Sequence, residues 1–108
     1  MRIISKSKVE DCFDGSSVYR YWFAERWTRA SIQELRALGE LEYFADFPKP
    51  FFRVCSKNGM QFKGVEGESS CQVVYPRQDK EAICRGFEDH FESEDVSTTA
   101  QVDERSSA

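Results

Sequence analysis

Four cysteines and one histidine are the residues of this chain best able to bind a metal or act as nucleophiles. Cys12, Cys55, Cys71 and Cys84 are separated by 43, 16 and 13 residues. No two of them have the C-x-x-C spacing of a zinc knuckle, a thioredoxin-like site or an iron–sulfur ligand set. The single histidine, His90, follows Cys84 by six residues, which is about 240° around a helix. The spacing therefore predicts no cofactor, no metal site and no Cys–His catalytic pair.

The acidic residues and glycines also lack the spacing of a catalytic or nucleotide-binding site. Glu88, Asp89 and Glu92 fit the solvated face of a helix, and no Asp/Glu cluster has the spacing of a metal-binding loop. Gly64 and Gly67 are not followed by the Lys-Ser/Thr pair that ends a phosphate-binding loop. We therefore expect no catalytic residues and a protein that is not an enzyme.

A basic stretch with interleaved aromatic residues could bind an anionic ligand. Between positions 49 and 63 there is no acidic residue, and the basic residues form a candidate basic patch: Lys49, Arg53, Lys57 and Lys63. Phenylalanines in the same stretch could stack on bases while the cations hold phosphates. A helix over 32–38 could act beside this hairpin, although it offers only Arg36 as a basic residue. The segment would make at most a weak nucleic-acid binder.

A run of aromatic residues between positions 19 and 27 is the second candidate binding feature. Tyr19, Phe23 and Trp27 have the spacing i, i+4, i+8 and predict a helix over about 17–29 with this stripe inward. Tyr21 would then point outward, since it lies about 200° around the helix from Tyr19. The candidate partner surface consists of Arg20, Tyr21 and Trp22, which are residue types enriched at interfaces.

A strand remains an alternative for residues 18–24, because their apolar residues also alternate. It would place Tyr19, Tyr21 and Phe23 on one face of a sheet. Residues 1–13 are equally open: Arg2–Ile4 could form a short strand, and Ser7 could cap a helical turn.

The helices and strands that the sequence predicts around these residues make an α+β fold, which begins with a pair of helices. The second helix of the pair covers about 32–38, where Ser31 and Glu34 have the form of a capping box. Gly39 is placed to end this helix. Pro48 and Pro50 make the connector that follows a short edge strand at 41–44.

A small antiparallel meander follows, because Asn58-Gly59 lies between two apolar runs and predicts a two-residue hairpin turn. Strands over 51–55, 60–63 and 71–75 result. With Asn58 and Gly59 as the turn, Cys55 lies opposite Phe62, so Phe51, Arg53 and Phe62 share one face with Cys71, Val73 and Tyr75. A C-terminal helix over 79–92 packs on this face through the stripe Ile83, Phe87 and Phe91.

Length and charge divide the chain into one domain and a tail. The 108 residues are 40% hydrophobic and carry a net charge of −4. Residues 1–92 hold 14 basic and 15 acidic side chains and form the predicted α+β domain, whereas residues 93–108 hold one basic and four acidic ones and are predicted to be a disordered acidic tail. The near-neutral domain argues against general nucleic-acid binding.

No apolar run of the sequence approaches the roughly 20 residues of a membrane helix, so we expect no membrane-spanning segment. We find no secretory signal pattern and expect a cytoplasmic protein with free thiols. The expected function is a non-enzymatic protein-interaction or accessory module that binds an unknown protein partner or itself. The alternatives are a thiol- or metal-dependent regulatory protein and a weak nucleic-acid binder through helix 32–38 and hairpin 49–63.

Overall fold

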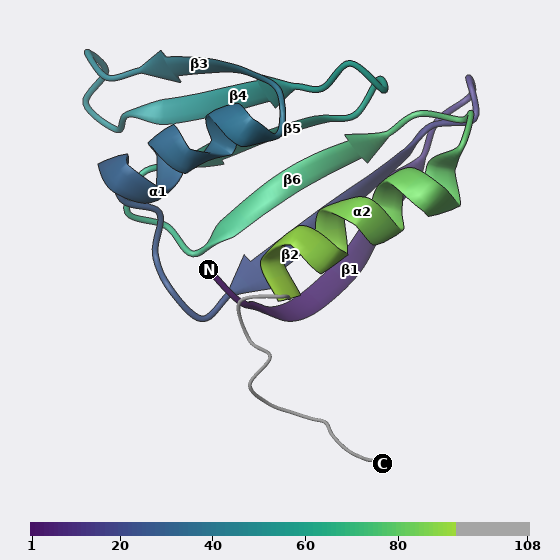
Figure 1. Ribbon diagram of the computed structural model, residues 1–108, viewed down its shortest axis with the longest axis horizontal. Coiled ribbons are helices and arrows are strands. Elements are labelled where there is room, and N and C mark those ends of the chain that lie inside the picture. Colours follow the sequence, from purple (N-terminus) through teal and green to yellow (C-terminus); the bar gives the residue numbers. More distant parts are fainter. Residues whose placement is uncertain (93–108) are drawn as a thin grey trace.

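Six antiparallel strands form one sheet in the computed structural model, which describes residues 1–92 (Figure 1). The strands are β1 (Ile3–Asp11), β2 (Ser17–Phe23), β3 (Glu40–Phe44), β4 (Phe51–Cys55), β5 (Gln61–Val65) and β6 (Ser70–Tyr75). Their order across the sheet is β1-β2-β6-β5-β4-β3. Helix α1 (Arg29–Glu34), the 3₁₀ helix η1 (Leu35–Ala37) and helix α2 (Lys80–Glu92) complete the fold.

Both helices lie on the same side of the sheet, α1 over β4 and β5 and α2 over β2 and β1, next to β6 (Figure 1). Because both helices cover this side, we call it the inner face and the opposite side the open face. The predicted acidic tail over 93–108 lies outside the described residues.

The predicted N-terminal helical pair is wrong, because its first helix is strand β2. Tyr21 of this strand pairs with Lys6 of β1 on one side and with Cys71 of β6 on the other. Valine, tyrosine, tryptophan and phenylalanine all favour strands, and here they occupy both faces of an interior strand. The helical spacing of Tyr19 and Phe23 is therefore accidental, and the alternation left open above describes this segment.

The N-terminal residues form a long edge strand, β1, in place of the expected short strand or helical turn. Its pairing with β2 slips by one residue between Ile3 and Ser5 and again between Lys8 and Glu10. Each slip leaves one extra residue in β1, which is the geometry of a β-bulge. Almost all of β1 is exposed to solvent.

The second predicted helix exists, but it begins earlier than the sequence suggested. Thr28 is the N-cap of α1: its hydroxyl accepts a hydrogen bond from the Ser31 backbone, and the Ser31 hydroxyl accepts one from the Thr28 backbone. The capping box is thus Thr28 with Ser31, and the expected Ser31–Glu34 pair does not form it. This cap starts the helix at Arg29.

The β4–β5 hairpin has a three-residue turn where the sequence predicted a two-residue turn. The Ser56 amide donates to the Met60 carbonyl (2.8 Å), and Gly59 adopts a φ of 96°. Cys55 consequently pairs with Gln61, and Val54 pairs with Phe62. A shift of one residue moves a strand's side chains to the other face, so the predicted placement of Phe51, Arg53 and Cys55 beside Phe62 is wrong.

The core fills the space between the inner face and the helices. Trp27, which is 1% exposed, lies in the connection from β2 to α1 and packs against Phe23 and Phe52 with ring centroids 5.2 and 4.8 Å away. Its indole N–H donates to the Ser70 carbonyl (2.9 Å). Trp27 therefore joins both halves of the sheet to the helical layer.

The predicted C-terminal helix is confirmed, and its stripe Ile83, Phe87 and Phe91 packs on the sheet. Phe87 lies at the centre of this contact. Its ring centroid is 5.1 Å from Tyr21, 5.2 Å from Phe62 and 5.0 Å from Phe91.

Truncation of Phe87 tests this core. The side chain is 2% exposed and contacts two strands, so Phe87→Ala should reduce the free energy of unfolding by about 3–5 kcal/mol. Chemical denaturation of the variant measures this loss. Arg85→Ala, on the exposed side of α2, is the control and should change stability by about 0.5 kcal/mol or less. Equal effects of the two substitutions would contradict the packing of α2.

Candidate functional site

A row of polar side chains crosses the open face from one edge of the sheet to the other. The strand register aligns these residues in the order Ser7, Arg20, Gln72, Lys63, Arg53 and Glu42. We call this set the central row. It brings three cations from three different strands onto one surface, although they are far apart in the sequence.

An aromatic row runs beside the central row, two residues further along each strand. Trp22 of β2 lies at one end, and Phe51 of β4 and Phe44 of β3 lie at the other. The rings of Phe44 and Phe51 stack with centroids 4.6 Å apart, and Phe47, which is 52% exposed, lies 5.2 Å from Phe51. Aromatic rings and cations are therefore neighbours on the open face.

The three cations of the central row differ in how far they are already neutralised. Arg53 is held by Glu42, with its Nε 2.8 Å from Glu42 Oε1, and this hydrogen bond followed by the attraction of the carboxylate raises the Arg53 pKa. Among the residues that the structure describes, Arg20 donates only to the neutral amide oxygen of Gln72 (3.3 Å). Lys63 forms no ion pair with a residue of the described chain. Arg20 and Lys63 therefore retain their charge for a ligand.

A hollow of about 490 Å³ lies on the open face between the two ends of the aromatic row. Its side-chain lining comes from Arg20, Phe51, Lys63, Glu68, Ser70 and Gln72. The hollow thus has one aromatic wall and a rim of hydrogen-bond donors that also holds the carboxylate of Glu68. Such an arrangement suits the binding of an anionic group next to an apolar one.

The structure unites two of the three residues of the candidate partner surface with two of the four residues of the candidate basic patch. Arg20 and Trp22 of the candidate partner surface lie on the open face, as do Arg53 and Lys63 of the candidate basic patch. Tyr21 is 0% exposed and belongs to the core, so its predicted exposure is wrong. In a strand, neighbours point to opposite faces, which separates Tyr21 from Arg20 and Trp22.

The other two lysines of the candidate basic patch lie outside the open face. Lys49 is in the β3–β4 connection and Lys57 is in the β4–β5 turn. The central row also contains Gln72, which the sequence did not single out. Its position opposite both Arg20 and Lys63 follows from strand pairing, and a single sequence carries no local signal for it.

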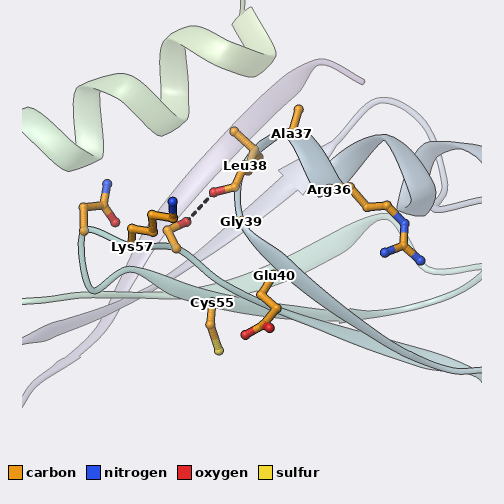
Figure 2. Close-up of a pocket in the computed structure, with 9 residues that line it drawn as sticks. Arg36, Ala37, Leu38, Gly39, Glu40, Cys55 and Lys57 are labelled. Atoms are coloured by element: carbon orange, nitrogen blue, oxygen red, sulfur yellow. Dashed lines mark hydrogen bonds between the residues drawn. The ribbon is translucent and has the colours of Figure 1, made fainter.

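A second hollow, of about 830 Å³, lies between the end of η1 and the β4–β5 turn. Figure 2 shows Arg36 and Lys57 on opposite sides of the segment that contains Gly39. Cys55 and Glu40 point to the other side of the sheet from Leu38 (Figure 2). Arg36 and Lys57 therefore line this hollow from opposite sides.

Polar side chains also meet beneath α2, around one oxygen of Glu88. Glu88 Oε2 accepts hydrogen bonds from Lys6 Nζ (2.7 Å), from the Tyr21 hydroxyl (2.7 Å) and from Cys84 Sγ (3.3 Å). The Tyr21 hydroxyl also lies 2.8 Å from that of Tyr75. These contacts tie β1, β2, β6 and α2 together.

The electrostatics of this cluster favour a structural role. Burial alone would raise the pKa of Glu88, but the hydrogen bonds from Lys6, Tyr21 and Cys84 outweigh it and lower the pKa. The hydrogen bond to Glu88 raises the pKa of Lys6, and burial raises that of Tyr21. A carboxylate with a lowered pKa is a poor general base for the neighbouring thiol. We therefore interpret the cluster as a latch that holds α2 on the sheet.

The thiols and the histidine do not assemble into a metal site within the described chain. All four cysteines are free, and burial raises the pKa of Cys71. Within residues 1–92 no three His, Cys, Asp or Glu side chains are grouped to hold a metal ion. No helix in this part of the chain has the length and apolar character needed to cross a membrane.

Glu88→Gln tests the latch through its pH dependence. The folded pKa of Glu88 is lowered, so its stabilising effect is complete above the unfolded pKa, close to 4.5, and is lost as the pH falls through the folded value. The difference in unfolding free energy between wild type and Glu88→Gln should therefore shrink on acidification below about pH 4.5. Denaturation curves at several pH values measure it, with exposed Asp89→Asn as the control. A difference that is constant with pH would contradict the latch.

Searches of protein-family models, of curated proteins and of solved structures return no match for this chain. The interpretation of the open face therefore rests on its own geometry.

Proposed function

We propose that this protein is a non-enzymatic interaction module of the cytoplasm that binds a partner protein through the open face of its sheet. The observation that carries the proposal is the convergence of Arg20, Phe51 and Lys63 around one hollow, with Trp22 on the same face of the sheet. Arginine, tryptophan and other aromatic residues carry much of the binding energy at protein interfaces. Four free thiols fit a reducing compartment.

The shape of the site supports binding more than catalysis. Arginine, lysine and the glutamine amide around the hollow are hydrogen-bond donors, and Phe51 offers an apolar surface next to them. Cys84, with Glu88 beside it, belongs to the latch on the other face of the sheet. Donors that surround an apolar wall suit the recognition of a side chain on another molecule.

A different protein fits the open face better than a second copy of this chain does. Two copies stacked face to face about a twofold axis that runs along the central row would bring Arg20 and Lys63 of one copy against the same residues of the other. Like charges in contact destabilise an interface. A partner with complementary charge avoids this repulsion.

Photo-crosslinking tests the proposal. A photoreactive amino acid at exposed Gln61 on the open face should give a covalent adduct with a specific protein in cell extract, whereas the same amino acid at Arg85 on α2 should not. Trp22→Ala should remove the adduct, and circular dichroism should show that this variant is folded. The same adduct from both positions, or an adduct that survives Trp22→Ala, would contradict binding at the open face.

A further inference from the structure

We infer that the open face recognises an extended protein segment in which a carboxylate and an apolar residue lie two positions apart. This inference rests on the proposed function and specifies the chemistry of the partner. The carboxylate would lie between Arg20 and Lys63, above Gln72, and the apolar side chain would enter the hollow above Ser70, next to Val65.

Charge complementarity is the first argument. Arg53 is neutralised by Glu42, whereas Arg20 contacts only a neutral amide and Lys63 has no carboxylate partner within residues 1–92. Arg20 and Lys63 both lie opposite Gln72, one on β2 and the other on β5. Two strand spacings separate them, about 10 Å, and their long side chains can converge on one carboxylate over the strand between them.

Gln72 adds a directional donor to this pair. Its amide oxygen accepts the hydrogen bond from Arg20 (3.3 Å), so its NH₂ group is left to donate. A carboxylate accepts from several donors at once. The three side chains thus form a cationic cradle with one neutral donor at its centre.

The spacing of the two rows supplies the second argument. The row that holds the aromatic residues lies two residues along each strand from the central row, as Trp22 lies from Arg20, Ser70 from Gln72 and Val65 from Lys63. Two residues of a strand span about 7 Å. An extended segment that runs along the strands presents residues i and i+2 on one side with the same separation, so it can place a carboxylate on one row and an apolar side chain on the other.

Acidic residues at the borders of the site favour a protein segment over a nucleic acid. Glu42 ends the central row, and Glu68 lines the hollow. A nucleic-acid strand carries a phosphate charge at each nucleotide and would meet these carboxylates as well as the cations. A segment with spaced carboxylates can contact Arg20 and Lys63 and leave neutral residues next to the acidic border.

Three probes separate these chemistries: a peptide of repeated Glu-Ser-Leu-Ser, the peptide of repeated Gln-Ser-Leu-Ser, and a single-stranded oligothymidylate. Fluorescence anisotropy with the full chain should show that the Glu peptide binds at least about tenfold more tightly than the Gln peptide. The double variant Arg20→Glu/Lys63→Glu should lose about tenfold or more of this affinity. The matched variant Lys57→Glu/Arg85→Glu changes the net charge equally away from the open face, and it should bind like wild type.

The outcomes decide between the hypotheses. Equal binding of the two peptides, or full binding by Arg20→Glu/Lys63→Glu, would overturn the inference. Oligothymidylate binding that exceeds peptide binding and is lost in the same variant would assign the site to nucleic acid. Where the reversed charges unfold the chain, Arg20→Gln/Lys63→Gln replaces that variant. A crosslink from Gln61 without Glu-peptide binding would reject the acidic segment and leave the proposed function standing.

Discussion

The backbone conformation of Gly59 determines which side chains of β4 enter the core. Its φ of 96° belongs to the left-handed region that glycine adopts without strain, and it closes a three-residue turn that pairs Cys55 with Gln61. Phe52 and Val54 consequently pack under the helices, while Phe51 and Arg53 point the other way. A two-residue turn would exchange these sets, expose two core residues and bury an arginine. Both the core and the open face depend on this single turn.

One-sided coverage of the sheet follows from how few helical residues the fold has. Two short helices cover the inner face, where the large aromatic side chains Trp27, Tyr75 and Phe87 are almost fully buried. The other face must remain compatible with water, and the central row of polar side chains makes it so. The apolar residues of that face lie in the aromatic row and, on the other side of the central row, at the paired Val18 and Val74. Because the helices cover only the inner face, the open face is left exposed, with charged and aromatic side chains next to each other.

The sequence predicted where helices and strands lie better than it predicted which face of the sheet each side chain occupies. The strands near 41–44, 51–55 and 71–75 and the helix over 79–92 are present, because turn residues and a regular stripe mark them. Strand β2 was mistaken for a helix because Tyr19, Phe23 and Trp27 also have helical spacing, and a single sequence does not show which of the two periodicities is used. Arg20, Trp22, Arg53 and Lys63 were found as separate features. Only the strand order, which depends on contacts between distant residues, joins them into one site.

The two bulges of β1 have a consequence for the behaviour of the protein at high concentration. A straight edge strand offers unpaired backbone groups to other chains and can seed fibrils. β1 is long and exposed, but its extra residues near Ser5 and Glu10 interrupt the regular ladder. In an antiparallel pairing of two such edges centred on Ser7, Lys6 of one copy would lie opposite Lys8 of the other, and like charges directly opposite each other are destabilising. The bulges and the lysines of β1 therefore disfavour the association of this edge with the edge strand of another molecule.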